Sequence, residues 1–186
     1  EWSAPSAIVP ADFDGDGQMD MLLCNALQSG TSHVFLRGDG SGTGFRYLPD
    51  HPLAQVQGHA AVVADLDHSG GREVAFVSQS APGIQLWQPT AQGYVPVLDE
   101  ALAEADPART IRATDVDHDG DLDLLTESGL FTANGDGSWR RQMEGLEALS
   151  SDAASVLPMD LDQDRDRDLV VVGQQGLWVI RNDRIW

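Results

Sequence analysis

Short apolar runs alternate along this chain with acidic segments that contain glycine, and the whole pattern occurs four times. In each occurrence one apolar run precedes the acidic segment and a second run, often β-branched, follows it. The preceding runs are residues 6–9, 60–63, 110–113 and 154–157, and the following runs are residues 21–24, 74–77, 124–125 and 169–172. Runs of this length beside Gly- and Asp-rich segments are typical of β-strands. We therefore predict four β-hairpins, each with an acidic connection.

Each hairpin is followed by two further predicted strands. The first of them carries an aromatic side chain, at residues 34–36, 86–87, 130–131 and 177–179, and the second lies near residues 45–47, 94–95, 139–140 and 185–186. The acidic segments begin 53, 50 and 45 residues apart, a spacing that indicates a propeller or a solenoid. Four strands in each of four units predict an all-β fold, a β-propeller of four four-stranded blades. We assign residues 1–186 to a single domain, with repeats at approximately 3–50, 56–99, 108–143 and 152–186.

The acidic segments share a nine-residue pattern, which in the first segment has acids at positions 1, 3, 5 and 9 and glycine at position 6. Calcium takes six to eight oxygen ligands at roughly 2.3 to 2.6 Å, so alternating carboxylates closed by a further acid suit this ion. An EF-hand would need Glu at position 12, where this chain has Leu23, Phe76, Thr126 and Val171. The acid at position 9 must therefore close each site. The predicted side-chain ligands are Asp12, Asp14, Asp16 and Asp20; Asp65, Asp67, Ser69 and Glu73; Asp115, Asp117, Asp119 and Asp123; and Asp160, Asp162, Asp164 and Asp168.

Two of the four segments depart from the pattern. In the second segment Ser69 replaces a carboxylate and Arg72 lies beside Glu73, so we expect calcium to bind more weakly there. In the fourth segment Arg165 occupies the glycine position, where the sharp turn calls for a positive φ that costs a residue with a Cβ about 1 kcal/mol or more. We expect up to four Ca²⁺ ions, with the first and third segments as the strongest sites.

These segments and their flanking strands resemble the FG-GAP or VCBS-type repeat, the integrin-α-like repeat family whose Asp-x-Asp-x-Asp-Gly-x-x-Asp loop binds calcium between the first two strands of each blade. The resemblance covers essentially the whole chain. It implies the same side-chain ligands, and it adds ligation by the backbone carbonyl at position 7, which is Gln18, Gly71, Asp121 and Asp166. The departures at Ser69, Glu73 and Arg165 affect the second and fourth loops.

Four blades in an open stack would expose an apolar face at each end, and such faces need a cover. Three arrangements would cover these faces. They are a closed ring of four blades, a larger ring of which this chain is a fragment, and an eight-bladed ring shared by two chains. The family that the chain resembles is best known from seven-bladed rings. Because the chain starts before a first strand and ends after a fourth one, we expect closure with little strand exchange, and the closed four-bladed ring is our first expectation.

The formal net charge of −19 comes from 30 acids and 11 Lys and Arg, and the four acidic segments contain 17 of these acids. Four calcium ions would leave about −11, so we expect neither nucleic acid nor an anionic membrane as a partner. No apolar stretch reaches the roughly 20 residues of a membrane-spanning helix. Cys24 is the single cysteine, which excludes an intrachain disulfide. The chain begins at Glu1 without an initiator Met or a signal peptide, so we expect a mature product or an excised domain.

Two features of the sequence could suggest binding sites, but each has a structural interpretation. Arg37-Gly38-Asp39 spells a cell-adhesion tripeptide, but it coincides with a predicted turn that the third repeat has at residues 134–137. Trp87 and Trp178 occupy equivalent positions, where we predict packing between blades and not a ligand platform.

Two histidines and one segment lie outside the predicted strands and the predicted ligand positions. His68 and His118 share position 4 of their loops and are expected to face solvent or pack over the loop. Residues 99–105 have helical propensity, so we expect a short helix between the second and third blades.

These expectations favour an exported, non-enzymatic protein in which calcium is structural. Extracellular calcium modules typically work at roughly 10⁻⁴ to 10⁻³ M, which places the chain in an extracellular, periplasmic or cell-surface setting. The first interpretation is a scaffold or recognition module for a protein or glycan partner. The alternatives are a substrate-binding propeller of a polysaccharide-active enzyme and an oligomerisation domain that forms a homodimer. The fold alone does not choose among them, since propellers have many unrelated functions.

Overall fold

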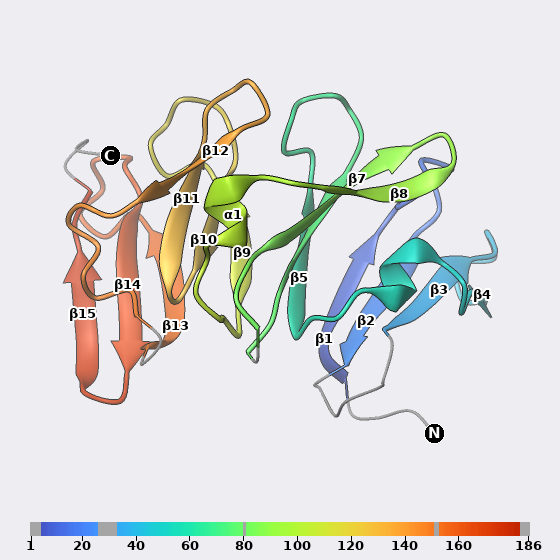
Figure 1. Cartoon of the computed structure of the whole chain (residues 1–186), viewed down its shortest axis with the longest axis horizontal. Helices are drawn as coiled ribbons and strands as arrows, with labels where there is room; N and C mark the ends of the chain where they lie inside the picture. The colour runs from blue at the N-terminus through green and yellow to red at the C-terminus, as the bar shows by residue number, and fades with distance from the viewer. Residues whose placement is uncertain (1–4, 26–32, 80, 151–152, 183–186) are drawn as a thin grey trace.

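The computed structural model describes residues 5–25, 33–79, 81–150 and 153–182, which form four antiparallel sheets (Figure 1). The first sheet contains β1 (Pro5–Ala11), β2 (Asp20–Asn25), β3 (Val34–Gly38) and β4 (Phe45–Tyr47). The second contains β5 (Ala60–Ala64), β6 (Glu73–Val77), β7 (Gln85–Thr90) and β8 (Gly93–Val97). The third contains β9 (Ile111–Thr114), β10 (Asp123–Thr126), β11 (Gly129–Ala133) and β12 (Trp139–Gln142). The fourth contains β13 (Ala153–Met159), β14 (Asp168–Gly173) and β15 (Gly176–Ile180).

Strands follow one another in space as they do along the chain, and every neighbouring pair is antiparallel. This up-and-down order is the blade of a β-propeller, so the predicted all-β fold with four blades is confirmed. The fourth strand predicted for the last blade, at residues 185–186, lies outside the described residues.

Helical structure is confined to two short segments in the part of the chain that is described. The 3-10 helix η1 (Pro52–Gln55) follows the first blade, and α1 (Glu100–Ala103) follows the second. Asp99 caps α1 by accepting a hydrogen bond from the Leu102 N–H at 3.0 Å, which confirms the short helix expected in this segment. Neither helix is long and apolar enough to cross a membrane.

Consecutive blades pack face to face through apolar side chains. We call the face of a blade that meets the next blade along the chain its forward face, and the opposite face its back face. Strand alternation assigns the residues, so that β6 sends Ala75 and Val77 forward to the third blade and Val74 and Phe76 back to the first. The interface of the third and fourth blades includes Leu125, Leu130, Leu169 and Val171. Three buried clusters, one for each internal interface, make up the core.

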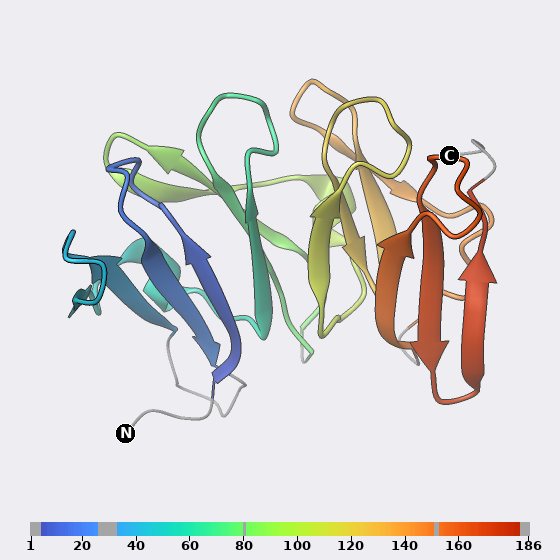
Figure 2. The same cartoon turned by 180° about the vertical axis from the view of Figure 1, so that it is seen from behind.

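The four blades form an open row in which the first and the fourth lie at opposite ends (Figures 1 and 2). The contacts between blades run from each blade to the next, through β1 and β5, β5 and β9, and β10 and β13. The expectation that the four blades close directly into a ring is therefore wrong for this chain, because the first and fourth blades do not face each other. The forward face of the fourth blade and the back face of the first blade are left at the two ends of the row.

Candidate metal centres

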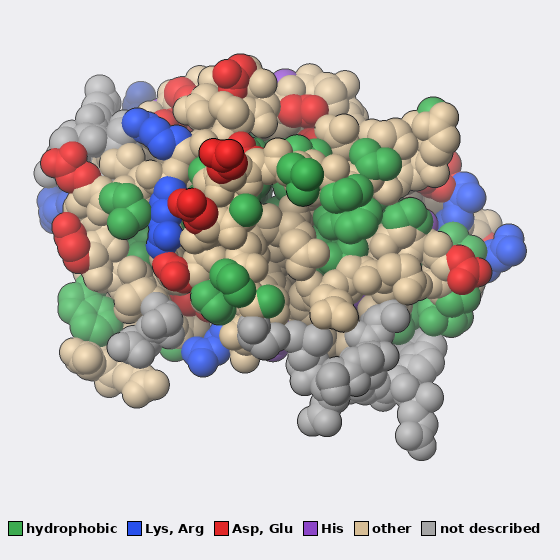
Figure 3. Space-filling view, viewed as in Figure 1, with side chains coloured by type: hydrophobic (Ala, Val, Ile, Leu, Met, Phe, Trp, Pro, Cys, Tyr) green, Lys and Arg blue, Asp and Glu red, His purple; other side chains and the backbone are tan. Residues whose placement is uncertain are grey.

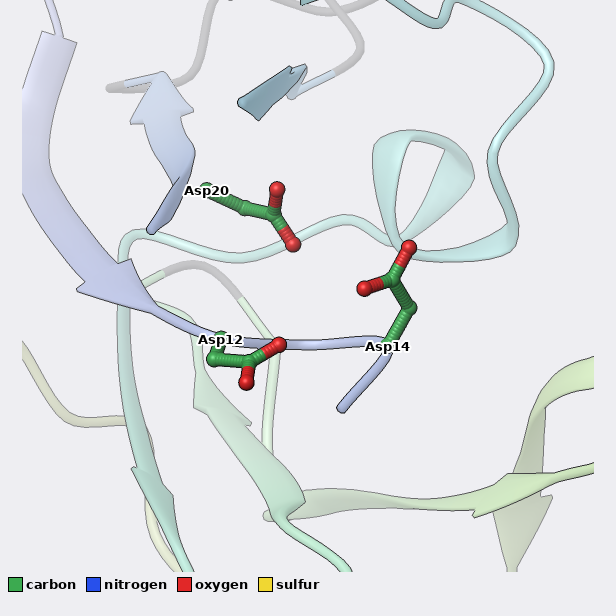
Figure 4. Close-up of side chains that lie close together, drawn as sticks. All are labelled: Asp12, Asp14 and Asp20. Carbon is green, nitrogen blue, oxygen red and sulfur yellow. The ribbon is translucent and has the colours of Figure 1, made fainter. Parts of the chain in front are cut away.

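The four acidic loops connect the first two strands of their blades, as predicted, and all four lie at the same edge of the row (Figures 1 and 2). Acidic side chains are visible along this upper edge in the space-filling view, and others lie lower on the same face (Figure 3). Within each loop three carboxylates converge, with one oxygen of each lying within 4.8 Å of the others. The groups are Asp12, Asp14 and Asp20; Asp65, Asp67 and Glu73; Asp115, Asp117 and Asp123; and Asp160, Asp162 and Asp164. Figure 4 shows the carboxylates of the first group turned toward a common space.

All four loops have the same backbone conformation. Positions 4 and 6 are left-handed in each, with φ between 56° and 75° at position 4 and between 83° and 98° at position 6. The carboxylate at position 1 holds this turn in three of the loops, as when Asp12 accepts hydrogen bonds from the N–H groups of Gly15 at 2.8 Å and Gly17 at 2.9 Å. Asp160 makes the equivalent contacts with Gln163 and Arg165, at 2.7 and 3.1 Å. The shared conformation explains why Asp and Gly recur at these positions.

The side chain at position 5 supports the turn rather than joining the converging group in three loops. It accepts a hydrogen bond from the N–H of position 7 in every loop, from Gln18 to Asp16 at 2.8 Å, Gly71 to Ser69 at 3.2 Å, Asp121 to Asp119 at 2.9 Å and Asp166 to Asp164 at 2.9 Å. Ser69 keeps this hydrogen bond, so the second loop retains its shape without the carboxylate. Ligation by the position-7 carbonyls stays a prediction.

The acid at position 9 is buried in every blade and connects three parts of the blade. One oxygen accepts a hydrogen bond from the N–H of position 2, from Phe13 to Asp20 at 3.2 Å, Leu66 to Glu73 at 2.7 Å, Val116 to Asp123 at 2.8 Å and Leu161 to Asp168 at 3.0 Å. In three blades the other oxygen accepts from the end of the third strand, from Gly38 to Asp20 at 2.8 Å, Ala133 to Asp123 at 3.1 Å and Asn182 to Asp168 at 3.0 Å. This structural role is one that the sequence pattern did not predict.

The electrostatics of the loops favour a cation. Burial raises the pKa of Asp20, Glu73 and Asp123, the last to about 7, although backbone N–H donors oppose the shift. Glu73 Oε1 and Asp115 Oδ1 are buried without a hydrogen-bond partner among the described residues. A buried carboxylate oxygen without a donor is unfavourable, and a divalent cation would supply the missing partner. The donor set, which is entirely oxygen, suits a hard cation such as calcium.

Two arginines contact the carboxylates of the outer loops. Arg37, at the end of β3, lies 2.7 Å from Asp14 and 2.9 Å from Asp16, and its hydrogen bond to Asp16 lowers the pKa of that carboxyl. Arg181, which follows β15, lies 2.9 Å from Asp162. Neither contact was predicted from the sequence, although Arg37 is the second-to-last residue of β3 and Arg181 directly follows β15. In the Arg37-Gly38-Asp39 tripeptide the arginine is thus directed at its own blade, consistent with the structural interpretation of that turn.

Neighbouring loops are joined by the residues at position 4. His68 Nε2 lies 2.9 Å from Asp121 of the third loop, and His118 Nε2 lies 3.9 Å from Asp166 of the fourth loop. In both cases position 4 of one loop reaches position 7 of the next. The side chains of both histidines are exposed, so the expectation that they face solvent is confirmed, and the contact with the next loop is an additional feature. The corresponding residues of the first and second loops are Gly15, at position 4, and Gly71, at position 7, and neither has a side chain that could make this contact.

Trp87 and Trp178, expected at equivalent positions, differ in register and surroundings. Trp87 pairs with Val74, whereas Trp178 pairs with Val171, two residues beyond the equivalent of Val74. Trp87 packs against the interface of the first and second blades, as predicted. Trp178 is 38% exposed, so the prediction that it packs between blades is wrong. It borders a crevice of about 370 Å³ that is lined by Glu147, Ala148, Ser150, Ala153, Gln174, Gln175 and Trp178.

Replacing Arg165 by glycine is expected to raise the unfolding free energy by about 1 kcal/mol, because Arg165 has a φ of 83° that glycine adopts without strain. Arg167→Gly is the matched control, since it removes the same charge from a residue that does not have a positive φ. Urea denaturation of the two variants measures the difference. If R165G is no more stable than R167G, the backbone at this position is not strained.

The fold defines a four-bladed β-propeller with an acidic cluster in each blade. An Agrocybe aegerita lectin, described as specifically recognising non-reducing terminal N-acetylglucosamine, superposes with a TM-score of 0.58 at 17% identity, over 96% of this chain and 50% of the lectin. The biofilm matrix protein Bap1 of V. cholerae superposes with a TM-score of 0.56 at 19% identity, over 94% of this chain and 29% of Bap1. At these identities the likeness is one of fold, and the chain spans half or less of each of these proteins. No protein-family model and no curated protein matches the chain, so membership of the FG-GAP or VCBS family stays a prediction.

Proposed function

We propose that this chain is a calcium-binding, non-enzymatic recognition module that works outside the cytosol and binds glycan. The observation that carries the calcium part is the convergence of three carboxylates at the same place in each of four blades, within 4.8 Å in every case. Like charges at this separation repel one another strongly unless a cation lies between them. The carboxylates would bind calcium through their oxygens, and the acid at position 9 would close the site in the first three loops. In the fourth loop Asp164, at position 5, takes the place of Asp168 in the converging group.

Calcium in these sites has a structural role in the proposal. Each ion would join the loop to the start of the second strand, where Asp20, Glu73 and Asp123 are buried. Binding to the folded chain alone stabilises it by mass action. Extracellular calcium, at roughly 10⁻³ M, is sufficient for sites of the affinity that such modules have.

Recognition of glycan is supported by the crevice beside β15. It combines a partly exposed indole at Trp178 with the amides of Gln174 and Gln175 and the carboxylate of Glu147. A sugar ring has an apolar C–H face and a rim of hydroxyl groups, and these match an aromatic surface flanked by hydrogen-bonding groups. The fold-level likeness to a lectin that recognises N-acetylglucosamine supports the same ligand class.

The test combines two measurements on the intact chain. Isothermal titration with CaCl₂ is expected to show binding that Asp12→Asn and Asp115→Asn weaken, and a glycan array in 2 mM CaCl₂ is expected to identify ligands. Trp178→Ala should then lower affinity for those glycans at least tenfold, about 1.4 kcal/mol, and leave calcium binding unchanged. Leu98→Ala, at a side chain that is 95% exposed outside the crevice, is the control. The absence of calcium heat would contradict the metal sites, whereas calcium binding without any glycan ligand would contradict only the recognition role.

A further inference from the structure

The fourth blade exposes side chains whose equivalents are buried in the other three blades. Position 2 of the acidic loop packs against the next blade in the first three loops, where Phe13, Leu66 and Val116 are 5%, 6% and 0% exposed. Leu161, at the same position of the fourth loop, is 41% exposed. The loops have the same conformation, so the difference arises because no described blade lies beyond the fourth.

The rest of this forward face is also apolar. Val172 is 43% exposed, whereas its equivalents Cys24 and Val77 are at most 1% exposed. Val172 pairs with Leu177, and Val170 pairs with Leu157 and Val179, so that these side chains share one face of the sheet. Hydrophobic side chains lie at this outer end of the molecule, beside the position of β15 (Figures 1 and 3). The sheet thus ends in an aliphatic surface of the type that forms each internal interface.

The back face of the first blade has the complementary character. Ile8 is 60% exposed, and β2 and β3 add Met21, Leu23 and Leu36 to the same face. The equivalent residues of the second blade, Ala61, Val74 and Phe76, pack against the first blade. The two ends of the row therefore carry the two halves of the interface that occurs three times inside it.

We propose that the forward face of the fourth blade packs on the back face of the first blade in a second copy of this chain, and that two such contacts close a ring of two chains. A second copy is the occupant that the structure favours because it carries both faces, and each contact would continue the pattern of the three internal interfaces. Head-to-tail contacts of this kind form closed rings when the rotation allows it and filaments when it does not. The lectin chain that matches this fold has about twice the length of the matched part, which is the length that two copies provide.

Polar residues at the edge of the contact follow the same rule as inside the chain. Position 4 of one loop reaches position 7 of the next in the His68–Asp121 and His118–Asp166 pairs. In the proposed contact, position 4 of the fourth loop is Gln163 of one copy and position 7 of the first loop is Gln18 of the other. The same relation would place these two side chains together. Two amides can donate and accept hydrogen bonds mutually, so the pair adds no unpaired charge to the interface.

The test is the mass of the 186-residue chain in solution with 2 mM CaCl₂, measured by light scattering after size exclusion and by sedimentation velocity. The expected result is a dimer, with twice the monomer mass of 20.0 kDa. Val172→Asp and Ile8→Asp place a carboxylate on one or the other face, and each is expected to raise the dimer dissociation constant about 100-fold or more. Leu98→Asp adds the same charge at an exposed apolar side chain away from both faces and should remain dimeric.

An equimolar mixture of the two face variants provides a second measurement. Their heterodimer has one unaltered contact and one contact with both substitutions, so partial recovery of dimer is expected only for head-to-tail packing. Circular dichroism establishes that each variant is folded before its mass is interpreted. A monomeric wild-type chain, a dimer that I8D leaves intact, or an open-ended polymer would each overturn the two-chain ring.

Discussion

Chelating calcium with EDTA is expected to lower the melting temperature of this chain by about 10 to 20 °C relative to 10 mM CaCl₂. A ligand present at about 100 times its dissociation constant, as 10 mM calcium is for a site of about 10⁻⁴ M, stabilises the folded state by about 2.7 kcal/mol for each site. The first and third loops, which keep both the four predicted carboxylates and the glycine at position 6, would together contribute about 5 kcal/mol. For a domain of this size each kcal/mol shifts the melting temperature by about 2 to 4 °C.

Differential scanning calorimetry in EDTA and in calcium measures the shift, and MgCl₂ in place of CaCl₂ tests the preference for the larger cation. Asp117→Asn should reduce the shift, because Asp117 is one of the three converging carboxylates of the third loop. Asp50→Asn removes the same charge from an exposed residue outside the loops and should preserve the shift. Equal melting temperatures in EDTA and calcium would contradict a structural role for the ion.

Replacing Asp123 by alanine is expected to lower the unfolding free energy by about 3 kcal/mol in EDTA. The loss should be larger in calcium, because the variant also lacks one of the three converging carboxylates of the third loop. Asp123 is fully buried and accepts hydrogen bonds from the N–H groups of Val116, at 2.8 Å, and Ala133, at 3.1 Å. Without the carboxylate both N–H groups stay buried without their acceptor, and each such loss costs about 1 to 3 kcal/mol. The burial that raises the pKa of Asp123 to about 7 also means that the charged side chain is costly in the folded state, which keeps the net loss below the sum of the two.

Asp117→Asn is the comparison that separates the two roles of the acids. An asparagine retains an acceptor oxygen for the Asp119 N–H, which lies 3.3 Å from Asp117 Oδ1, but it removes a charge from the converging group. Asp117→Asn should therefore lower the unfolding free energy in calcium and change it little in EDTA. Urea denaturation of both variants under both conditions gives the four free energies. If D123A is destabilising in calcium alone, the carboxylate acts as a metal ligand and its hydrogen bonds to the backbone contribute little.

The hairpins and the place of each acidic loop could be predicted from the sequence, because these depend on local patterns. Runs such as residues 169–172 are strands because their side chains fill both faces of a sheet, and Asp12 and Gly17 recur as a pair because the turn uses both. The left-handed conformation expected for Arg165 is present for the same reason, since position 6 of every loop has it. Local chemistry sets these features, so a single repeat is enough to predict them.

The features that sequence analysis missed depend on distance in space. Arg37 meets Asp14 because β3 lies beside β2, and the pairing of these strands is not a property of either segment alone. The second role of Asp20 depends on the N–H of Gly38 in the same way. The exposure of Trp178 depends on the register in which β15 pairs with β14, and the open row depends on how whole blades are placed. The repeat pattern specifies neither. Periodicity therefore predicted the unit and its loop but did not determine whether the row closes.

All four acidic loops lie at one edge of the row (Figures 1 and 2), and together they contain 17 of the 30 acids. Such a one-sided distribution gives the calcium-free chain a large electric dipole moment across its blades. The chain would then turn its loop edge away from any anionic surface, with an orientation that depends on ionic strength. Calcium loading would cancel much of this moment, so the ions would decide which edge of the molecule faces its surroundings as well as how stable the fold is.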